Sequence, residues 1–242
     1  MNKLWPVAGG AVAGLLATHA GPALASIGPL RRRVAPDLTG VGRPDHVALT
    51  FDDGPHPLST PRFLELLDQL AVKATFFLLG RWAANAPGLV GEIAAGGHEI
   101  AVHGYDHRCL LVRGPRATHD DLARARDVIS DAAGRPVSWF RPPYGVLTAG
   151  TLLATRRLGL TPVLWTAWGR DWSARATPGS VYRTVTADLG GGGTILLHDS
   201  DVTSAPGSWR ATLGAVPRLV TACRQRGLQV GTLAEHGLPP AT

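Results

Sequence analysis

The chain has 242 residues, enough for one sizeable domain, and shows neither a repeat nor a long linker that would argue for a second. Hydrophobic residues make up 45% of it, a share typical of a globular α/β protein and not of a disordered or fibrous one. The net charge of +6 comes from arginine, and no basic run is interleaved with aromatic residues, which argues against nucleic-acid binding. A preference for anionic surroundings, such as a cell-wall polymer, remains compatible with this charge.

The first 25 residues resemble a secretory signal peptide. Lys3 supplies a basic start, residues 4–17 are apolar and rich in small side chains, and Ala23-Leu24-Ala25 offers a cleavage site. Three arginines follow at 31–33, and their charge favours keeping this flank in the cytoplasm. The sequence therefore predicts an exported protein, secreted or associated with the cell envelope, and favours cleavage over an uncleaved N-terminal membrane anchor.

Residues 26–44, with Gly, Pro and Arg, are expected to form a linker, and the folded domain is expected over 45–236. Strands are predicted at short apolar runs: 46–51, 74–79, 98–102, 137–140, 160–165, 194–198 and 229–233. Helices are predicted at the amphipathic stretches between them: 60–72, 82–95, 117–133, 148–158, 179–189 and 209–226. This alternation predicts a mainly parallel sheet, closed or partly closed as a barrel, although an open doubly wound sheet would give a similar pattern.

Nearly every polar group suited to catalysis follows one of the predicted strands. In parallel α/β proteins the carboxyl ends of the strands meet at one edge and form the site. We therefore expect one rim to carry Asp52, Asp53, His103, His107, Arg141, Tyr144, Asp171 and His198.

Asp52 and Asp53 are adjacent carboxylates at the end of the first strand, and they would repel each other without a cation or a basic partner. His103 and His107 lie four residues apart, a spacing that lets both imidazoles bind one ion from a helix face or a compact loop. Taken alone, each pair is more typical of a surface turn or of capping residues. Together they offer one carboxylate and two imidazoles, a set that zinc commonly uses and that also suits Co²⁺, Ni²⁺ or Mn²⁺.

The remaining carboxylate has the chemistry of a base. Asp52 could accept a proton from water, with Arg141 keeping it ionised and oriented. His198 could protonate a leaving group, and Asp171 could hold its ring and raise its pKa. Considered one at a time, a structural Arg–Asp pair and a histidine bonded to backbone explain these residues at least as well.

The two cysteines, Cys109 and Cys223, are too few for a disulfide framework or a thiolate metal site. Two unpaired, buried thiols are favoured, and a single bridge stays open as the alternative in an exported protein. A monomer is expected.

Five short motifs, in this order, resemble those of the polysaccharide deacetylases of the NodB-homology type, carbohydrate esterase family 4. The resemblance covers roughly residues 45–235. The motifs are Thr50–Pro55, His103–His107, Arg141–Gly145, Asp171-Trp172 and Leu196–His198.

The resemblance implies a distorted (β/α) barrel with fewer than eight complete units over 45–236. It implies that Asp53, His103 and His107 bind a divalent metal ion, usually zinc. It further implies that Asp52 is the general base, oriented by Arg141, and that His198 is the general acid, supported by Asp171. The backbone N–H of Tyr144 would stabilise the oxyanion. The substrate contacts implied are Trp172, Leu196, Tyr144 and Pro143.

The reaction implied is hydrolysis of an N-acetyl, sometimes an O-acetyl, group on a sugar, with release of acetate. We expect an exported metal-dependent deacetylase that acts on N-acetylglucosamine-type residues of a cell-wall glycan, with peptidoglycan favoured and chitooligosaccharides second. One alternative is an O-acetyl esterase of the xylan type on the same scaffold. Another is a non-catalytic wall-glycan binding protein, which would be expected to lack a metal ligand or the base, and neither is missing from this sequence.

One position departs from the family pattern. The second motif usually carries Ser or Thr after its first histidine, and here that residue is Gly104. The usual hydroxyl supports the loop and is not a metal ligand, so the departure bears on loop rigidity and metal affinity more than on the reaction. His56, His98 and His119 match no catalytic position and are interpreted as structural or surface residues.

Overall fold

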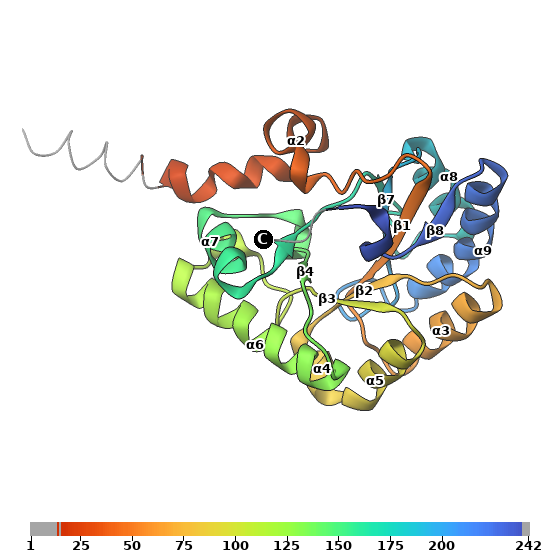
Figure 1. Ribbon diagram of the computed structural model, residues 1–242, viewed down its shortest axis with the longest axis horizontal. Helices are drawn as coiled ribbons and strands as arrows, with labels where there is room; N and C mark the ends of the chain where they lie inside the picture. Colours follow the sequence, from red (N-terminus) through yellow and green to blue (C-terminus); the bar gives the residue numbers. More distant parts are fainter. Residues whose placement is uncertain (1–13, 15, 239–242) are drawn as a thin grey trace, which may run out of the picture.

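A computed structural model of the chain describes residues 14 and 16–238. A single eight-stranded sheet, parallel in every pairing, lies inside a layer of helices (Figure 1). Seven strands follow the order β5-β4-β3-β2-β1-β7-β6, and β8 pairs with the beginning of β1. The sheet curls into an open half-barrel, which confirms the predicted distorted barrel.

The strands are β1 (His46–Asp52), β2 (Thr75–Leu78), β3 (Glu99–Val102), β4 (Trp139–Phe140), β5 (Thr161–Pro162), β6 (Ala167–Trp168), β7 (Thr194–His198) and β8 (Gln229–Gly231). The α-helices are α2 (Gly28–Val34), α3 (Thr60–Gln69), α4 (Gly80–Asn85), α5 (Pro87–Ala95), α6 (Pro115–Ala133), α7 (Ala149–Leu158), α8 (Pro178–Asp188) and α9 (Trp209–Gln225). The 3₁₀ turns are η1 (Gly21–Ser26), η2 (Pro36–Leu38), η3 (Leu110–Val112), η4 (Pro143–Gly145) and η5 (Ala234–His236).

The central strand β1 is buried along its whole length. It pairs with β2 and β7 over its second half and with β8 over its first. A strand that is covered on both faces has a continuous apolar sequence, and for this reason the predicted strand 46–51 agrees closely with β1. The run ends at Asp52, so this strand delivers the two carboxylates to the middle of the rim.

Two predicted elements are divided in the structure. The predicted strand 160–165 gives only β5, and the chain then crosses to β6 at the opposite end of the strand order. The predicted helix 82–95 is α4 followed by α5, because Pro87 has no N–H to donate to the preceding turn and instead begins a new helix.

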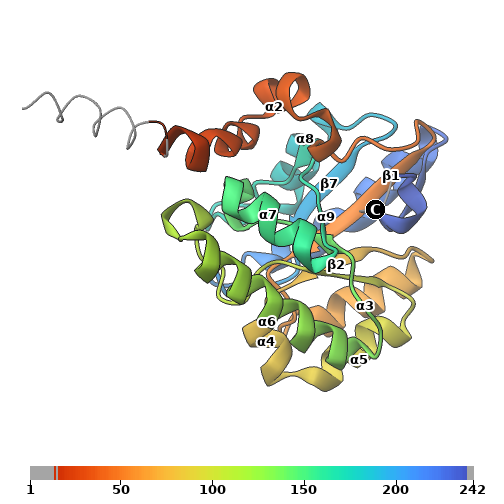
Figure 2. The same cartoon turned by 60° about the vertical axis from the view of Figure 1, so that its left-hand side comes forward.

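The segment 26–44, predicted to be a linker, is largely helical and packs on the domain. We call residues 21–40, which comprise η1, α2 and η2, the N-terminal arm (Figure 2). The N–H of Leu164 donates to the carbonyl of Leu38 at 2.9 Å, and Arg31 is only 6% exposed. The apolar patterning of a core does not reveal such a segment, because its attachment rests on arginine and backbone groups.

Just over half of the predicted signal peptide, 1–25, lies outside the residues that the structure describes, and its residues 21–25 belong to η1. Among the described residues, no helix combines the length and the hydropathy needed to cross a bilayer. Both cysteines are free, as favoured from the sequence, but only Cys223 is buried and Cys109 is half-buried.

The amino ends of the strands are closed by the C-terminal segment. Oε2 of Glu99 accepts hydrogen bonds from Thr75 Oγ1 (2.6 Å) and from the N–H groups of Leu233 and Ala234 (2.9 and 3.2 Å). Its Oε1 accepts from Trp139 Nε1 at 2.9 Å. Every polar contact here joins one part of the fold to another, so this end is a structural closure.

A buried histidine pair completes this closure. Nδ1 of His46 lies 2.8 Å from Nδ1 of His236, and Nε2 of His236 faces the carbonyls of Gly40 and Gly192, each at 3.1 Å. His98, interpreted from the sequence as structural, accepts the N–H of Ala74 on its Nδ1 at 3.2 Å. All three imidazoles thus bind backbone or one another.

Candidate active site

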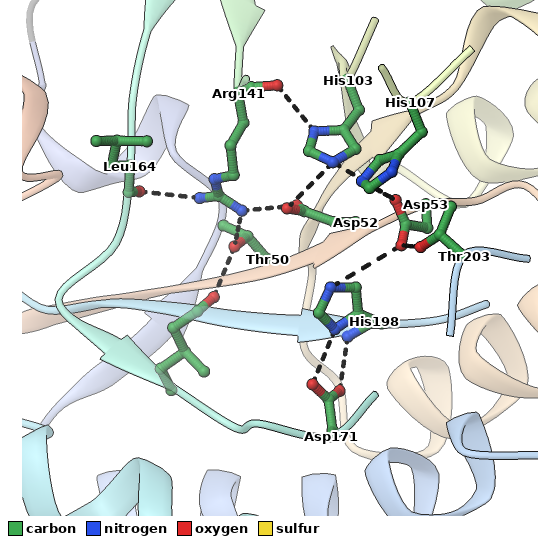
Figure 3. A network of polar contacts seen from close by, with 11 residues as sticks. Thr50, Asp52, Asp53, His103, His107, Arg141, Leu164, Asp171, His198 and Thr203 are labelled. Atoms are coloured by element: carbon green, nitrogen blue, oxygen red, sulfur yellow. Dashed lines mark hydrogen bonds and ion pairs between the residues drawn. The ribbon is translucent and has the colours of Figure 1, made fainter. Parts of the chain in front are cut away.

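A pocket of about 310 Å³ opens at the carboxyl ends of the strands. Its walls come from segments that follow β1, β3, β4, β6 and β7, far apart in the sequence. The structure therefore brings the predicted polar residues to one rim (Figure 3). The residues lining it are Asp52, Asp53, His103, His107, Pro142, Tyr144, Gly145, Trp165, Trp168, Trp172, Leu196, His198, Thr203 and Ser204.

The two adjacent aspartates have different nearest partners, although Oδ2 of Asp52 also lies 3.8 Å from Nε2 of His103 (Figure 3). Asp53 has a φ of 75°, an uncommon conformation for a residue other than glycine, and it lies just beyond the end of β1. Its Oδ1 lies 3.4 Å from Nε2 of His103 and 3.4 Å from Nε2 of His107. Oδ1 of Asp52 instead accepts a hydrogen bond from Arg141 Nη1 at 2.7 Å.

The residues Asp53, His103 and His107 fit a divalent metal ion. One ligand atom from each lies within 4.8 Å of the others, and Asp53 Oδ1 is buried with no hydrogen-bond partner among the described residues. His103 Nδ1 lies 2.8 Å from the carbonyl of Arg141, a contact that assigns the proton to Nδ1 and leaves the Nε2 lone pair free. A set of one carboxylate and two imidazoles with an orphaned oxygen suits Zn²⁺ and its first-row neighbours.

The charge states in this cluster are those that a metal ligand needs. Burial alone would raise the pKa of Asp53, but His198, His103, His107 and the hydrogen bond from Thr203 outweigh it, so that the pKa is lowered. Burial, followed by the charge of His103, lowers the pKa of His107 to about 4. Asp53 is therefore ionised and His107 neutral near pH 7.

Arg141 is fully buried and supports both halves of the site. Its Nη1 donates to Asp52 Oδ1 and to Thr50 Oγ1, each at 2.7 Å, and its Nη2 donates to the carbonyl of Leu164 at 3.1 Å. The guanidinium carbon lies 4.0 Å from the centre of the Phe77 ring. These contacts fix the carboxylate of Asp52, while the carbonyl of the same arginine orients His103.

His198 and Asp171 form the second polar pair. His198 Nδ1 lies 2.8 Å from Asp171 Oδ1, and Asp171 Oδ2 accepts the N–H of His198 at 2.8 Å and the hydroxyl of Thr212 at 2.6 Å. Burial would lower the pKa of His198, but the charge and the hydrogen bond of Asp171 outweigh it and raise the pKa well above its ordinary value. Nε2 of His198 lies 4.0 Å from Asp53 Oδ2, so the protonated edge of the ring faces the pocket.

The pocket wall differs from the prediction at one residue. Trp172, Leu196 and Tyr144 line it, and Tyr144 has a φ of 60° at the turn η4. Pro143, predicted as a substrate contact, is not among the residues that line the pocket, whereas its neighbour Pro142 is, and both prolines are buried. Consecutive residues of a tight turn point in different directions, so a motif letter alone does not decide which of two prolines faces the pocket.

The departure at Gly104 has a structural counterpart. Gly104 has a φ of +88°, where a side chain would be strained. The loop is held by Asp121 of α6, whose Oδ2 accepts the N–H of Tyr105 at 3.0 Å and whose Oδ1 pairs with Arg113 at 2.7 Å. A carboxylate from a neighbouring helix thus supports the loop that carries His103 and His107.

Sequence reasoning missed Thr203, Trp165 and Trp168. The hydroxyl of Thr203 donates to Asp53 Oδ2, the carboxylate oxygen that faces away from the two metal-site histidines. Thr203 lies in the irregular loop after β7, where no periodic pattern marks a residue. Trp165 and Trp168 lie in the predicted strand 160–165 and just beyond it, and the repeated indoles of Trp165, Trp168 and Trp172 were the available signal.

The comparisons with known proteins agree with this geometry. The model of the polysaccharide deacetylase family matches residues 39–163. The chain belongs to this family. It is 36% identical over 203 residues to a chitooligosaccharide deacetylase of Bradyrhizobium sp. (strain ANU 289), a match that covers 80% of this chain and 89% of that protein. This deacetylase is also 33% identical over 159 residues to the peptidoglycan-N-acetylglucosamine deacetylase PgdA of Listeria monocytogenes serotype 1/2a (strain 10403S), covering 66% of this chain and 33% of that protein.

Solved structures extend the likeness to the fold. The Bc1960 peptidoglycan N-acetylglucosamine deacetylase superposes with a TM-score of 0.75 at 28% identity, covering 83% of this chain and 92% of that one. A family 4 carbohydrate esterase pseudoenzyme from Bacillus anthracis superposes with a TM-score of 0.72 at 26% identity, covering 79% and 65%. This deacetylase is therefore a hydrolase of carbon–nitrogen bonds other than peptide bonds, acting on carbohydrate.

Proposed function

We propose that the protein removes acetyl groups from N-acetylglucosamine residues within a glycan strand and releases acetate. The observation that carries this proposal is the division of the aspartate pair, with Asp53 facing His103 and His107 and Asp52 facing Arg141. This division separates a metal-binding carboxylate from a proton acceptor within one pocket. The pocket wall of indoles and Leu196 supplies the apolar surface that an acetyl methyl and the faces of sugar rings require.

Asp53, His103 and His107 would hold one divalent metal ion, zinc being favoured by the ligand set. When bound, such an ion supplies Lewis-acid activation of water and polarisation of the acetyl carbonyl. Asp52 accepts the proton of the attacking water, because its carboxylate is fixed by Arg141 and does not need to serve as a metal ligand. A carbon–oxygen bond forms, and the negative charge develops on the former carbonyl oxygen.

The second half of the reaction needs an acid and a charge stabiliser. The backbone N–H of Tyr144 donates to the developing oxyanion. His198, kept protonated by Asp171, gives its proton to the departing nitrogen as the carbon–nitrogen bond breaks. The products are acetate and the free amine of the sugar. Trp172 and Leu196 enclose the methyl of the acetyl group.

The two candidate glycans share this chemical unit. Peptidoglycan is favoured if the protein is exported, because export would place it beside the cell wall. Chitooligosaccharides are the second candidate. They are supported by the chitooligosaccharide deacetylase from Bradyrhizobium, because the match extends over 89% of that protein. We further propose that the protein acts outside the cytoplasm, in agreement with the signal-like first 25 residues. We also propose that it acts as a monomer.

Acetate release tests the proposal directly. Purified protein loaded with zinc or cobalt is given an N-acetylglucosamine tetramer, peptidoglycan and acetylxylan, with an Asp52→Asn variant as the control for contaminating hydrolases. We expect release from the N-acetylated glycans that depends on the metal and on Asp52. Release from acetylxylan alone would favour the O-acetyl esterase, and glycan binding without release would favour a wall-binding protein.

A further inference from the structure

The sheet has an opening that the chain crosses close to the active site. β5 and β6 stand at opposite ends of the strand order, and only residues 163–166 connect them. The carbonyl of Leu164 accepts Arg141 Nη2, while the N–H of Leu164 donates to the carbonyl of Leu38 in the N-terminal arm. This short segment therefore touches the catalytic arginine on one side and the arm on the other.

Arg31 is the side chain that fastens the arm to this segment. Its Nη2 donates to the carbonyl of Trp165 at 2.5 Å, and its guanidinium carbon lies 5.6 Å from the centre of the Trp165 ring. Arg31 is 6% exposed, whereas its neighbours Arg32 and Arg33 are exposed. Burying a guanidinium is costly unless its donors are used. Two of the three Arg31 nitrogens donate, Nη2 to Trp165 and Nη1 to the carbonyl of Ala25 at 3.4 Å, while Nε has no hydrogen-bond partner among the described residues. The contact with Trp165 therefore belongs to Arg31 and not to the basic run as a whole.

Trp165 stands at one end of a row of three indoles that line the pocket. The ring centres of Trp165 and Trp168 are 5.8 Å apart, and those of Trp168 and Trp172 are 4.5 Å apart with nearly parallel planes. A side chain at Gly145 would collide with the Trp165 ring, so this indole also packs on the turn that carries Tyr144.

We propose that Arg31 is a positioning residue for Trp165, and that Trp165 binds a sugar ring next to the residue being deacetylated. This inference rests on the proposed glycan deacetylase function and makes the arm a support for one wall of the substrate groove. Arg31 and the turn at Gly145 both contact the Trp165 indole and fix its orientation, and the indole lines the pocket with an apolar surface. Such a surface suits the apolar side of a pyranose ring.

The test compares Arg31→Gln with Arg33→Gln, which removes the same charge from an exposed position of the same helix. For each protein, kcat/KM is measured on the N-acetylglucosamine dimer and tetramer. We expect Arg31→Gln to reduce the advantage of the tetramer over the dimer by about three- to tenfold, mainly through KM. Arg33→Gln leaves this ratio unchanged, and Arg31→Lys restores part of it because lysine still donates to the carbonyl.

Trp165→Ala provides the second part of the test. Its effect on the ratio should equal that of Arg31→Gln, and the double variant should show no further loss, since both changes act on one contact. An equal loss on both substrates, or additive effects in the double variant, would overturn the proposal and leave Arg31 a residue of general stability. If the wild type releases no acetate from any glycan, the proposed function fails. Binding of the tetramer, followed by tryptophan fluorescence, then decides on Arg31: weaker binding by Arg31→Gln than by Arg33→Gln supports its role, and equal binding refutes it.

Discussion

Both ends of the half-barrel hold carboxylates and histidines, yet these groups are bonded differently at the two ends. At the amino end, both oxygens of Glu99 accept hydrogen bonds from the fold, and His236 uses both ring nitrogens. At the carboxyl end, Asp53 Oδ1 has no hydrogen-bond partner among the described residues and faces two imidazole nitrogens. A buried cluster of acids and histidines thus indicates a site only where a lone pair is left for a ligand.

The largest effect is expected at the carboxyl end. Asp52→Asn keeps the size of the side chain but removes the proton acceptor, so kcat for acetate release should fall by about 10²- to 10⁴-fold. Initial rates on the tetramer at saturating metal measure it. The matched change Asp45→Asn, at an exposed residue paired with Arg43, should leave kcat unchanged. If Asp52→Asn kept the kcat of the wild type, the general base would have to be another group.

Thr203 tests whether the second oxygen of Asp53 is used by the fold. Thr203→Val removes the hydroxyl that donates to Asp53 Oδ2, which should weaken zinc binding by about 10- to 100-fold. Competition with a chelating dye measures the affinity. Thr221→Val is the control, because the hydroxyl of Thr221 binds only a carbonyl of its own helix, at 2.9 Å. Equal affinities in the two variants would show that Asp53 is oriented without Thr203.

Asp171→Asn should change the pH profile. His198 must be protonated to act as the acid, so activity is present below its pKa and is lost as the pH rises through it. Asp171 raises this pKa, and removing its charge lowers it, which moves the alkaline limb of kcat to lower pH. Each unit of that shift reduces kcat about tenfold at a pH above both pKa values. An unchanged alkaline limb would show that another group supplies the proton; Asp127→Asn, on the surface, is the control.

Glu99 tests the amino end of the half-barrel, where we expect an effect on stability and none on catalysis. Glu99→Gln turns one acceptor oxygen into a donor among groups that already donate, and we expect the free energy of unfolding to fall by about 1–3 kcal/mol. Denaturant titration measures this loss against the exposed control Glu92→Gln. The kcat of the folded variant should stay within twofold of the wild type. A large loss of kcat would mean that the amino end takes part in catalysis.

The rim could be predicted because parallel strands read as apolar runs and their last residues carry the chemistry. Asp52, His103 and His198 follow such runs directly, and the structure brings them together. The contacts of Thr203, Arg31 and Trp165 could not be predicted in the same way. Each depends on a loop or an arm that meets a distant segment through one polar contact, and such contacts leave no period in the sequence.

The boundaries that were wrong have local physical causes. Pro87 divides the helix predicted at 82–95, and the strand predicted at 160–165 is cut short where the chain crosses the opening of the sheet. Hydrophobic pattern identifies an element, whereas its ends are decided by backbone geometry.

The division of labour between the adjacent aspartates is tested most directly by calorimetric titration of zinc into the metal-free wild type, Asp52→Asn and Asp53→Asn. We predict that Asp52→Asn binds one equivalent of zinc with nearly the affinity of the wild type. Asp53→Asn should bind it more than about 100-fold more weakly, because it loses the carboxylate that faces both histidines. Retained binding in Asp53→Asn together with lost binding in Asp52→Asn would contradict the account.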